Sequence, residues 1–188
     1  MSAAVVFMAG AETNRTYDEL LILLIRGGDR RASERLAARW YPRLLRTARR
    51  LLGDADLAQE TVQECWIAII RGLPRLLDPA RFPAWAFSIL HRKCADAIKR
   101  AVRDREQFRP SAVGAEASID ASGETRTALD QAFALLSQEH RAAAILFFGE
   151  GLSLAEIATA TDVPLGTAKS RIFHARQHLK AALEGDKP

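Results

Sequence analysis

The chain has 188 residues, 48% of them hydrophobic and 27% charged, with 27 lysines and arginines against 23 acidic residues. These proportions are typical of an ordinary globular protein with room for one medium domain or two small ones. No apolar run approaches the roughly 20 residues that span a bilayer, so we expect no membrane insertion. The N-terminal apolar stretch is short and no basic residue precedes it, which argues against a signal peptide. Residues 1–15 are expected to form a disordered leader.

Helical periodicity runs through nearly the whole chain, and no strand-like alternation persists, so the sequence predicts an all-α fold. A capping box at Thr16 predicts a first helix that ends at residues 27–28. Asp29 is expected to cap a second helix, which runs to about Leu52 and bends at Pro42. The side chains expected to face the core from this second helix are Leu36, Trp40, Leu44, Ala48 and Leu51.

A third helix is predicted over residues 55–71, and a fourth over residues 81–103 after the turn that begins at Asp78. The third helix should direct Leu57, Thr61, Val62, Trp66 and Ile69 toward the core. The fourth should bury Phe82, Trp85, Ala86 and Ile89. Cys65 and Cys94 form no recognisable pattern, so we interpret both as buried apolar side chains, with a redox switch or a metal site as the minor alternative.

Residues 109–124 are small, polar and aperiodic, which predicts a flexible linker that could reach about 55 Å when extended. The linker would join two small helical domains, at residues 16–108 and 125–184. The second domain is expected to contain a helix over residues 125–136, another over residues 138–148, and then a glycine-rich turn.

A helix-turn-helix is predicted at the end of the chain. Ser153 and Glu156 form a capping box, and Pro164 separates the short helix that they open from a second helix beginning near Leu165. Residues 164–181 hold four bases and no acid. A helix that approaches phosphates needs this charge, so DNA is the expected partner, with a basic surface helix as the alternative interpretation. The expected buried stripe of the second helix is Ala168, Ile172, Ala175 and Leu179.

Charge is unevenly distributed over the rest of the chain. Residues 54–64 hold four acids and no base, whereas residues 81–109 hold eight bases and three acids. Opposite patches of this kind predict more than one class of partner. The acidic side chains lie three or four residues apart on one helix, where they could form either a docking surface or an ordinary solvated helix start.

Three segments together resemble the sigma-70 family of bacterial RNA polymerase initiation factors, and in particular its extracytoplasmic-function (ECF) group. Residues 54–60, followed by Glu64 and Trp66, are similar to the family's core-polymerase docking segment. Residues 82–85, followed by Ile89 and Asp96, are similar to the helix that reads and opens the −10 promoter element. Residues 151–171 are similar to the reader of the −35 element. The resemblance covers residues 17–183.

The resemblance implies a transcription initiation factor that acts in the cytoplasm, binds core RNA polymerase and promoter DNA, and is controlled by an anti-sigma factor. It implies no catalytic residue, metal or cofactor. It assigns polymerase docking to a coiled coil of the largest subunit, through Asp56, Gln59, Glu60 and Glu64. It assigns −10 recognition to Ser88, His91, Arg92, Lys93, Lys99 and Arg100. It assigns −35 recognition to Thr167, Lys169, Ser170, Arg171, His174 and Arg176.

Some positions stay open or depart from the family. Residues 72–81 correspond to the family loop that receives a flipped −10 base. Trp85 is expected to be a core residue rather than a melting wedge, and Phe173 could touch DNA, touch a protein or pack on the preceding helix. Asp162 stands where the family often has glycine, but an aspartate tolerates the left-handed turn.

Two other classes of protein remain as alternatives. A stand-alone helix-turn-helix regulator with an N-terminal sensory domain would bind duplex DNA by itself. Its sensory domain would need neither the acidic third helix nor the basic fourth one. An enzyme is disfavoured, because the sequence has no metal-spaced cluster, phosphate loop or nucleophile elbow.

Overall fold

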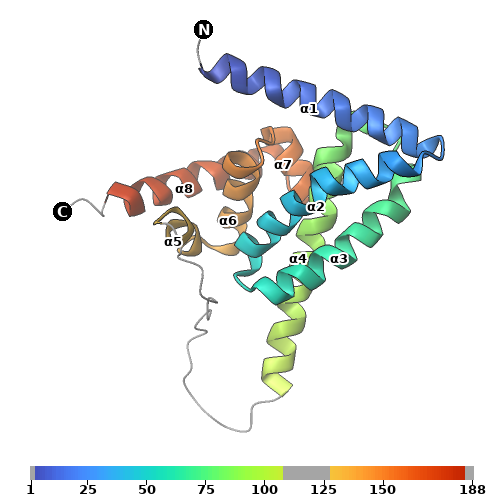
Figure 1. Ribbon diagram of the computed structural model, residues 1–188. Helices are drawn as coiled ribbons and strands as arrows, with labels where there is room; N and C mark the ends of the chain where they lie inside the picture. Colours follow the sequence, from blue (N-terminus) through green and yellow to red (C-terminus); the bar gives the residue numbers. More distant parts are fainter. Residues whose placement is uncertain (1–2, 108–127, 185–188) are drawn as a thin grey trace.

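The computed structural model describes residues 3–107 and 128–184, and within those ranges every regular element is a helix, which confirms the expected all-α class. Figure 1 shows the helices of the N-terminal half gathered beside those of the C-terminal half. The linker predicted at residues 109–124 lies outside the described residues. Among the residues described, no helix is both long and apolar enough to cross a bilayer.

Four long helices build the N-terminal half around an aromatic centre. The Trp40 ring meets the Phe82 ring edge-on at 4.8 Å between centroids, and the Phe87 ring lies 5.7 Å from it. All three side chains are fully buried. The elements are α1 (Ala3–Arg26), α2 (Arg30–Leu52), α3 (Ala55–Gly72), the 3-10 turns η1 (Leu73–Arg75) and η2 (Pro79–Arg81), and α4 (Phe82–Gln107).

The expected start of the first helix at Thr16 is wrong, because α1 begins at Ala3. The residues from Ala3 to residue 15, which were expected to be a disordered leader, are therefore helical. They contain no proline and one glycine, so nothing in their sequence stops the helix from extending toward the N-terminus. Extension of α1 also places Arg15 on a helix, where its side chain meets the C-terminal half.

Helix α2 matches its prediction closely. The Asp29 carboxylate accepts hydrogen bonds from the backbone N–H groups of Arg31 and Ala32, and Gly53 ends the helix with a left-handed φ of 71°. The helix continues through Pro42 without a break. All five side chains expected to face the core are buried.

Helix α3 is rotated slightly from its predicted orientation. Thr61, Val62 and Ile69 are buried as expected, but Leu57 and Trp66 are only half-buried. Ala58 and Cys65 occupy fully buried positions instead. Small side chains at these two positions let α3 approach its neighbours closely. The sequence pattern pointed to Leu57 and Trp66 instead, because their side chains are larger and more hydrophobic.

The C-terminal half contains α5 (Ala128–Ala134), α6 (Gln138–Ala144), the π-helical turn η3 (Ile145–Gly149), α7 (Leu154–Thr161) and α8 (Leu165–Glu184). The helix expected to reach residue 148 therefore changes its winding over its last turn. The capping box of Ser153 and Glu156 is present. Asp162 ends α7 with a φ of 54°, as its tolerance for the left-handed region predicts.

The two halves of the chain pack directly against each other. The main contact is between α4 and α7, and η3 and α6 also touch α2. Buried residues from both halves form one continuous hydrophobic cluster. In Figure 1, α7 accordingly lies against the N-terminal helices, and α8 extends away from them.

Candidate nucleic-acid and protein-docking surfaces

Helices α7 and α8 form the predicted helix-turn-helix. Ala168, Ile172, Ala175 and Leu179 are buried, so the expected stripe of α8 is confirmed. The turn between the two helices is closed by a hydrogen bond from the Val163 N–H to the Ala158 carbonyl at 3.0 Å. Because this stripe packs against the core, the opposite side of α8 faces solvent.

The six predicted −35 residues all lie off the buried stripe of α8, but they differ in exposure. Thr167 and Arg171 are half-buried. The Arg171 guanidinium lies 3.3 Å from the Glu139 carboxylate on α6, and the Arg171 side chain is 19% exposed. The exposed members of the set are Lys169, Ser170, His174 and Arg176.

Aromatic and imidazole rings gather beside the basic residues of α8. The Phe173 side chain is 57% exposed and touches the edge of the His174 ring, so it does not pack into the preceding helix. His140 of α6 lies 5.9 Å from His174 and 6.4 Å from His178, measured between ring centroids. Sequence spacing could not reveal this grouping, because α6 and α8 are brought together only by the fold. No group of metal ligands is assembled among the described residues.

Helix α4 carries the six residues predicted to contact the −10 element. Arg92, Lys99 and Arg100 are exposed, whereas the other three are half-buried. The Ser88 hydroxyl donates to the Trp85 carbonyl at 2.7 Å. Burial lowers the pKa of the His91 imidazole, and the nearby Arg171 guanidinium lowers it further. His91 thus feels the charge of Arg171, one of the predicted −35 residues.

Glu64 occupies a different place from the rest of the predicted polymerase-docking set. Its carboxylate accepts a hydrogen bond from the Lys93 ammonium at 2.9 Å and lies 3.5 Å from the Arg100 guanidinium. The hydrogen bond from Lys93 is the main cause that lowers the pKa of Glu64. The structure therefore joins one predicted docking residue to two predicted −10 residues.

The other predicted docking residues, Asp56, Gln59 and Glu60, are exposed on one side of α3. The stripe continues along the helix from Glu60 at spacings of three, four and three residues. Its further members were not singled out from the sequence, although helical spacing from Glu60 could have found them. They are Gln63, Ile67, which is 51% exposed, and Ile70, which is 40% exposed. We call these six residues the α3 face.

The loop between α3 and α4 is anchored by Trp85. A Cβ atom on Gly72 would lie 2.8 Å from the Trp85 Cζ2 atom, so only glycine lets α3 end so close to the ring. The Trp85 ring also lies 6.0 Å from the Phe82 ring. Trp85 therefore packs against the core as expected, but it is only half-buried. Leu77, in the loop itself, is 94% exposed.

Both cysteines are free and buried, as the sequence predicted. Burial raises the pKa of Cys65 and of Cys94 to about 12 in each case. A thiol with so little thiolate at neutral pH is a poor nucleophile and metal ligand, so both behave as small apolar side chains.

The outward basic helix of a helix-turn-helix, together with a second basic helix, is typical of a helical DNA-binding protein, and the acidic side of α3 is a candidate protein-docking surface. Family comparisons agree with this class. Residues 36–104 match the model of sigma-70 region 2, and residues 126–179 match that of sigma-70 region 4.

Relatives cover almost the whole chain. The ECF RNA polymerase sigma factor SigM of Mycobacterium tuberculosis is 30% identical over 93% of this chain and 88% of its own length. The RNA polymerase sigma-H factor of Pseudomonas aeruginosa is 29% identical over 89% of this chain and 94% of its own. A solved structure of CnrH in complex with the cytosolic domain of CnrY matches with a TM-score of 0.66 and 25% identity, over 91% of this chain and 99% of that one.

The chain therefore belongs to the sigma-70 family, within its ECF group. It is a transcription initiation factor that joins core RNA polymerase and directs it to promoters. The stand-alone helix-turn-helix regulator is not favoured, because the match extends over region 2 as well as over the DNA-binding region.

Proposed function

We propose that this ECF sigma factor docks on core RNA polymerase through the α3 face. The observation that carries the proposal is that Asp56, Gln59 and Glu60 all lie exposed on one side of one helix. A carboxylate and amide surface suits a basic coiled coil, because opposite potentials steer the partners together and fix their register.

The apolar end of the α3 face supports the same partner. Ile67 and Ile70 follow the polar residues at helical spacing and are about half exposed. A partner helix that buried them would gain about 25 cal/mol for each Å² of apolar surface removed from water. Charge would then set the orientation of the partner, and the two isoleucines would add affinity.

Glu64 has a different part in this proposal. Because its carboxylate is held by Lys93 and Arg100, it orients two bases of α4 rather than meeting the polymerase alone. Within the proposal it stays at the edge of the docking surface, where a polymerase base could compete for it.

We assign −10 recognition to the basic side of α4 and −35 recognition to the outward side of α8. Exposed bases such as Lys99 and Arg100 can hold the phosphates of an unstacked strand. On α8, the first turns would reach base edges, and later residues such as Arg176 would hold phosphates. The loop that carries Leu77 would receive the flipped base.

We further propose that an anti-sigma factor controls the chain, that the chain acts in the cytoplasm, and that it catalyses no reaction itself. Support for the inhibitor is that the similar structure of CnrH was solved in complex with the cytosolic domain of CnrY. Support for the location is that RNA polymerase, the partner of the family, works there. A purified inhibitor should abolish transcription when added before core enzyme and have less effect when added after it.

The docking assignment is tested with Glu60→Arg. Reversal of one charge on the α3 face should weaken binding to core RNA polymerase about tenfold or more, because a like charge would face the basic partner. Binding is measured by titration of fluorescently labelled factor with core enzyme. Helical content by circular dichroism should not change, because the side chain is exposed.

Glu34→Arg is the matched control. It makes the same charge change at an exposed position of α2, outside the α3 face. If the two variants bind core enzyme equally well, the α3 face is not the docking surface. If the unaltered chain does not bind core enzyme at all, the proposed function itself fails.

A further inference from the structure

Helix α2 carries a high concentration of positive charge. Its 23 residues include eight arginines and no lysine, against one acid, Glu34. Exposed positions recur along the helix at spacings of four, three, four, four and three residues, so they lie on one face. Six residues occupy this face, namely Arg31, Arg35, Ala38, Pro42, Arg46 and Arg49. We call these six residues the arginine stripe.

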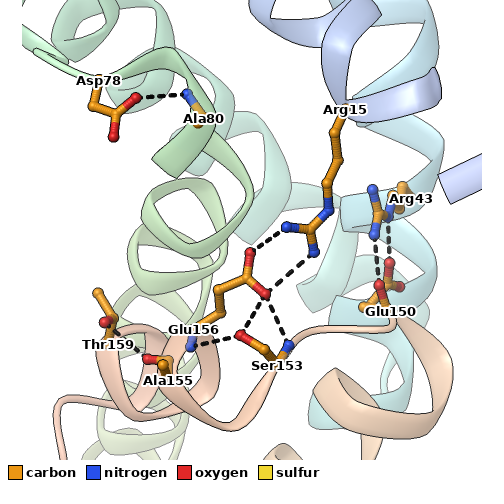
Figure 2. Close-up of polar contacts among 9 residues, drawn as sticks. All are labelled: Arg15, Arg43, Asp78, Ala80, Glu150, Ser153, Ala155, Glu156 and Thr159. Carbon is orange, nitrogen blue, oxygen red and sulfur yellow. Dashed lines mark hydrogen bonds and ion pairs between the residues drawn. The ribbon is translucent and has the colours of Figure 1, made fainter. Parts of the chain in front are cut away.

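Arginines of α2 that lie off the stripe are paired with acids of the chain itself. The Arg39 guanidinium lies 2.8 Å from the Asp18 carboxylate of α1. Arg43 donates to the carboxylate of Glu150, in the loop after η3, as Figure 2 shows. The Glu150 side chain is only 3% exposed, so this pair is closed to solvent and to other partners. These arginines therefore have a structural role inside the chain.

The four arginines of the stripe have no such partner. Among the residues that the structure describes, no carboxylate lies within ion-pair distance of any of their guanidinium groups. Glu34 is exposed nearby, but it pairs with Arg30 on another side of α2. Neighbouring like charges destabilise a helix, so an ordinary solvated face favours mixed charge. An acid-free row of arginines along one helix face is instead typical of a surface that meets an anionic partner.

The four arginines are arranged as two pairs. Within each pair the residues are three or four positions apart, so their side chains begin about 5–6 Å from each other. The inner members of the two pairs, Arg35 and Arg46, are separated by about 16 Å of helix. Between the pairs the stripe presents only Ala38 and Pro42, whose side chains have no hydrogen-bonding group.

This geometry fits the two phosphate backbones that border a groove of duplex DNA. The major groove is about 12 Å wide, and its phosphates stand at the two edges. A helix that lies across the groove can place one arginine pair on each backbone, with Ala38 and Pro42 over the groove itself. Guanidinium groups bind phosphate oxygens through two parallel hydrogen bonds, which an ammonium group cannot do, and α2 uses arginine alone.

We propose that the arginine stripe is a further DNA-binding surface, which holds duplex DNA by its phosphates whatever the base sequence. Ala38 and Pro42 offer no side-chain hydrogen bond to a base edge, so the stripe has no direct means of reading sequence. It therefore adds affinity for DNA without changing the choice of promoter. The inference does not depend on how −10 and −35 recognition is divided between α4 and α8.

The test removes one arginine pair, as Arg46→Gln with Arg49→Gln in the full chain. Glutamine keeps a long, polar, helix-forming side chain and loses the charge. Each phosphate contact contributes about 0.9 to the slope of log affinity against log salt, so the slope for a random duplex should fall by about 1.8. Binding is measured by fluorescence anisotropy at several salt concentrations. Helical content by circular dichroism should not change, because both side chains are exposed.

Arg30→Gln is the matched control for Arg46→Gln alone. It removes the same charge from the same helix, and the Arg30 side chain is 92% exposed, but Arg30 lies off the stripe. We expect the slope to fall by about 0.9 for Arg46→Gln and to stay unchanged for Arg30→Gln.

A second control keeps the charge of the pair, as Arg46→Lys with Arg49→Lys. A lysine also neutralises a phosphate, as a point charge, so this variant should keep the slope of the unaltered chain. Retention of the slope separates the loss of charge in the glutamine variant from any change in the packing of α2.

Several results would overturn the inference. Equal slopes for Arg30→Gln and Arg46→Gln would show that only net charge matters. An unchanged slope in the double glutamine variant would remove the phosphate contact, and weaker binding of that variant to core RNA polymerase would then assign the stripe to an acidic protein surface. A lower slope on a single strand but not on the duplex would exclude the arrangement across a groove, and so would an unaltered chain that does not bind the duplex.

The DNA assay contains no polymerase. Failure of the proposed sigma function would instead show as no binding of the unaltered chain to core enzyme, while the salt slopes would still report on the arginine stripe.

Discussion

His91 shows how the fold changes the chemistry of one predicted residue. From the sequence it is a DNA-facing histidine, but in the structure it is half-buried on α4 and feels the charge of the Arg171 guanidinium. Burial and the Arg171 charge both disfavour its protonated form, so its pKa in the folded chain is below the usual 6.5. The protonated form is accordingly more stable in the unfolded chain.

This shift predicts a pH dependence of stability. The unfolded chain binds more protons than the folded one as pH falls through 6.5, so folded stability should be full above that value and decline below it. The midpoint of thermal unfolding should decrease between about pH 7.5 and pH 5.5, and His91→Gln should flatten that decrease. The lowered pKa values of Glu64 and Glu156 act in a different window, because their usual value is 4.5.

His178→Gln is the control for this experiment, because His178 is an exposed histidine on α8. His178→Gln should leave the decrease in the midpoint of thermal unfolding between about pH 7.5 and pH 5.5 unchanged. An equal flattening in both variants would show that the pH dependence does not come from the buried position of His91.

At the scale of elements, the sequence predicted best where local chemistry decides the outcome. The cap at Asp29, the capping box at Ser153 and the left-handed turn at Asp162 all involve neighbouring residues, and all are present. It failed at the start of α1, because no local stop signal lies between residue 3 and Thr16. It also misplaced Leu57, since side-chain size suggested burial there and packing favoured Ala58.

The surroundings of the candidate site residues were harder to predict, because they depend on contacts between helices and not on neighbouring residues in the sequence. Their helices and outward orientation follow from helical spacing, so Lys169 and Arg176 are exposed as the pattern indicates. The engagement of Glu64 by Lys93 depends on how α3 packs on α4, which no local pattern reports. The grouping of His140 with two histidines of α8 is another product of packing alone.

Helix α8 supports a prediction about phosphate contacts. Arg176 is exposed near the middle of the helix, where it can neutralise one phosphate without reading a base. Arg176→Ala should reduce the slope of log affinity against log salt by about 1, whatever the DNA sequence. The measurement is fluorescence anisotropy of the full chain with a random duplex at several salt concentrations.

Gln177→Ala is the matched control for Arg176→Ala. Gln177 is an exposed neighbour on α8 and carries no charge, so its removal should leave the salt slope unchanged. Equal slopes for the two variants would mean that Arg176 does not touch a phosphate.

For the whole molecule, the notable feature is that two family regions share one hydrophobic cluster. Buried residues from α2, α4, α7 and α8 belong to the same core, although the division into domains at residues 109–124 remains a prediction. A shared core couples the stability of the two halves, because neither can unfold without exposing the surface that the other buries.

The shared core predicts cooperative unfolding. The chain should melt in a single calorimetric transition, with equal calorimetric and van't Hoff enthalpies. Arg43→Met leaves the buried Glu150 carboxylate between the two halves without its main partner, so it should broaden this transition or divide it in two. Two resolved transitions in the unaltered chain would contradict a shared core. Arg43→Met combined with Thr47→Val and Glu150→Leu leaves no buried charge without a partner and should restore the single transition.

The π-helical turn η3 lets the chain before Glu150 hold one residue more than an α-helix of the same rotation would need. A π turn winds one more residue into the helix than an α turn does, and it directly precedes Glu150. Loss of a single residue from Ile145–Gly149 would therefore be absorbed by a return to α-helical winding, with Glu150 kept in nearly the same direction. Loss of a residue elsewhere in this helix, with the π turn kept, would instead rotate Glu150 by about 100° away from Arg43. The contact between the two halves thus depends on the winding of this one turn as well as on the identity of the charges.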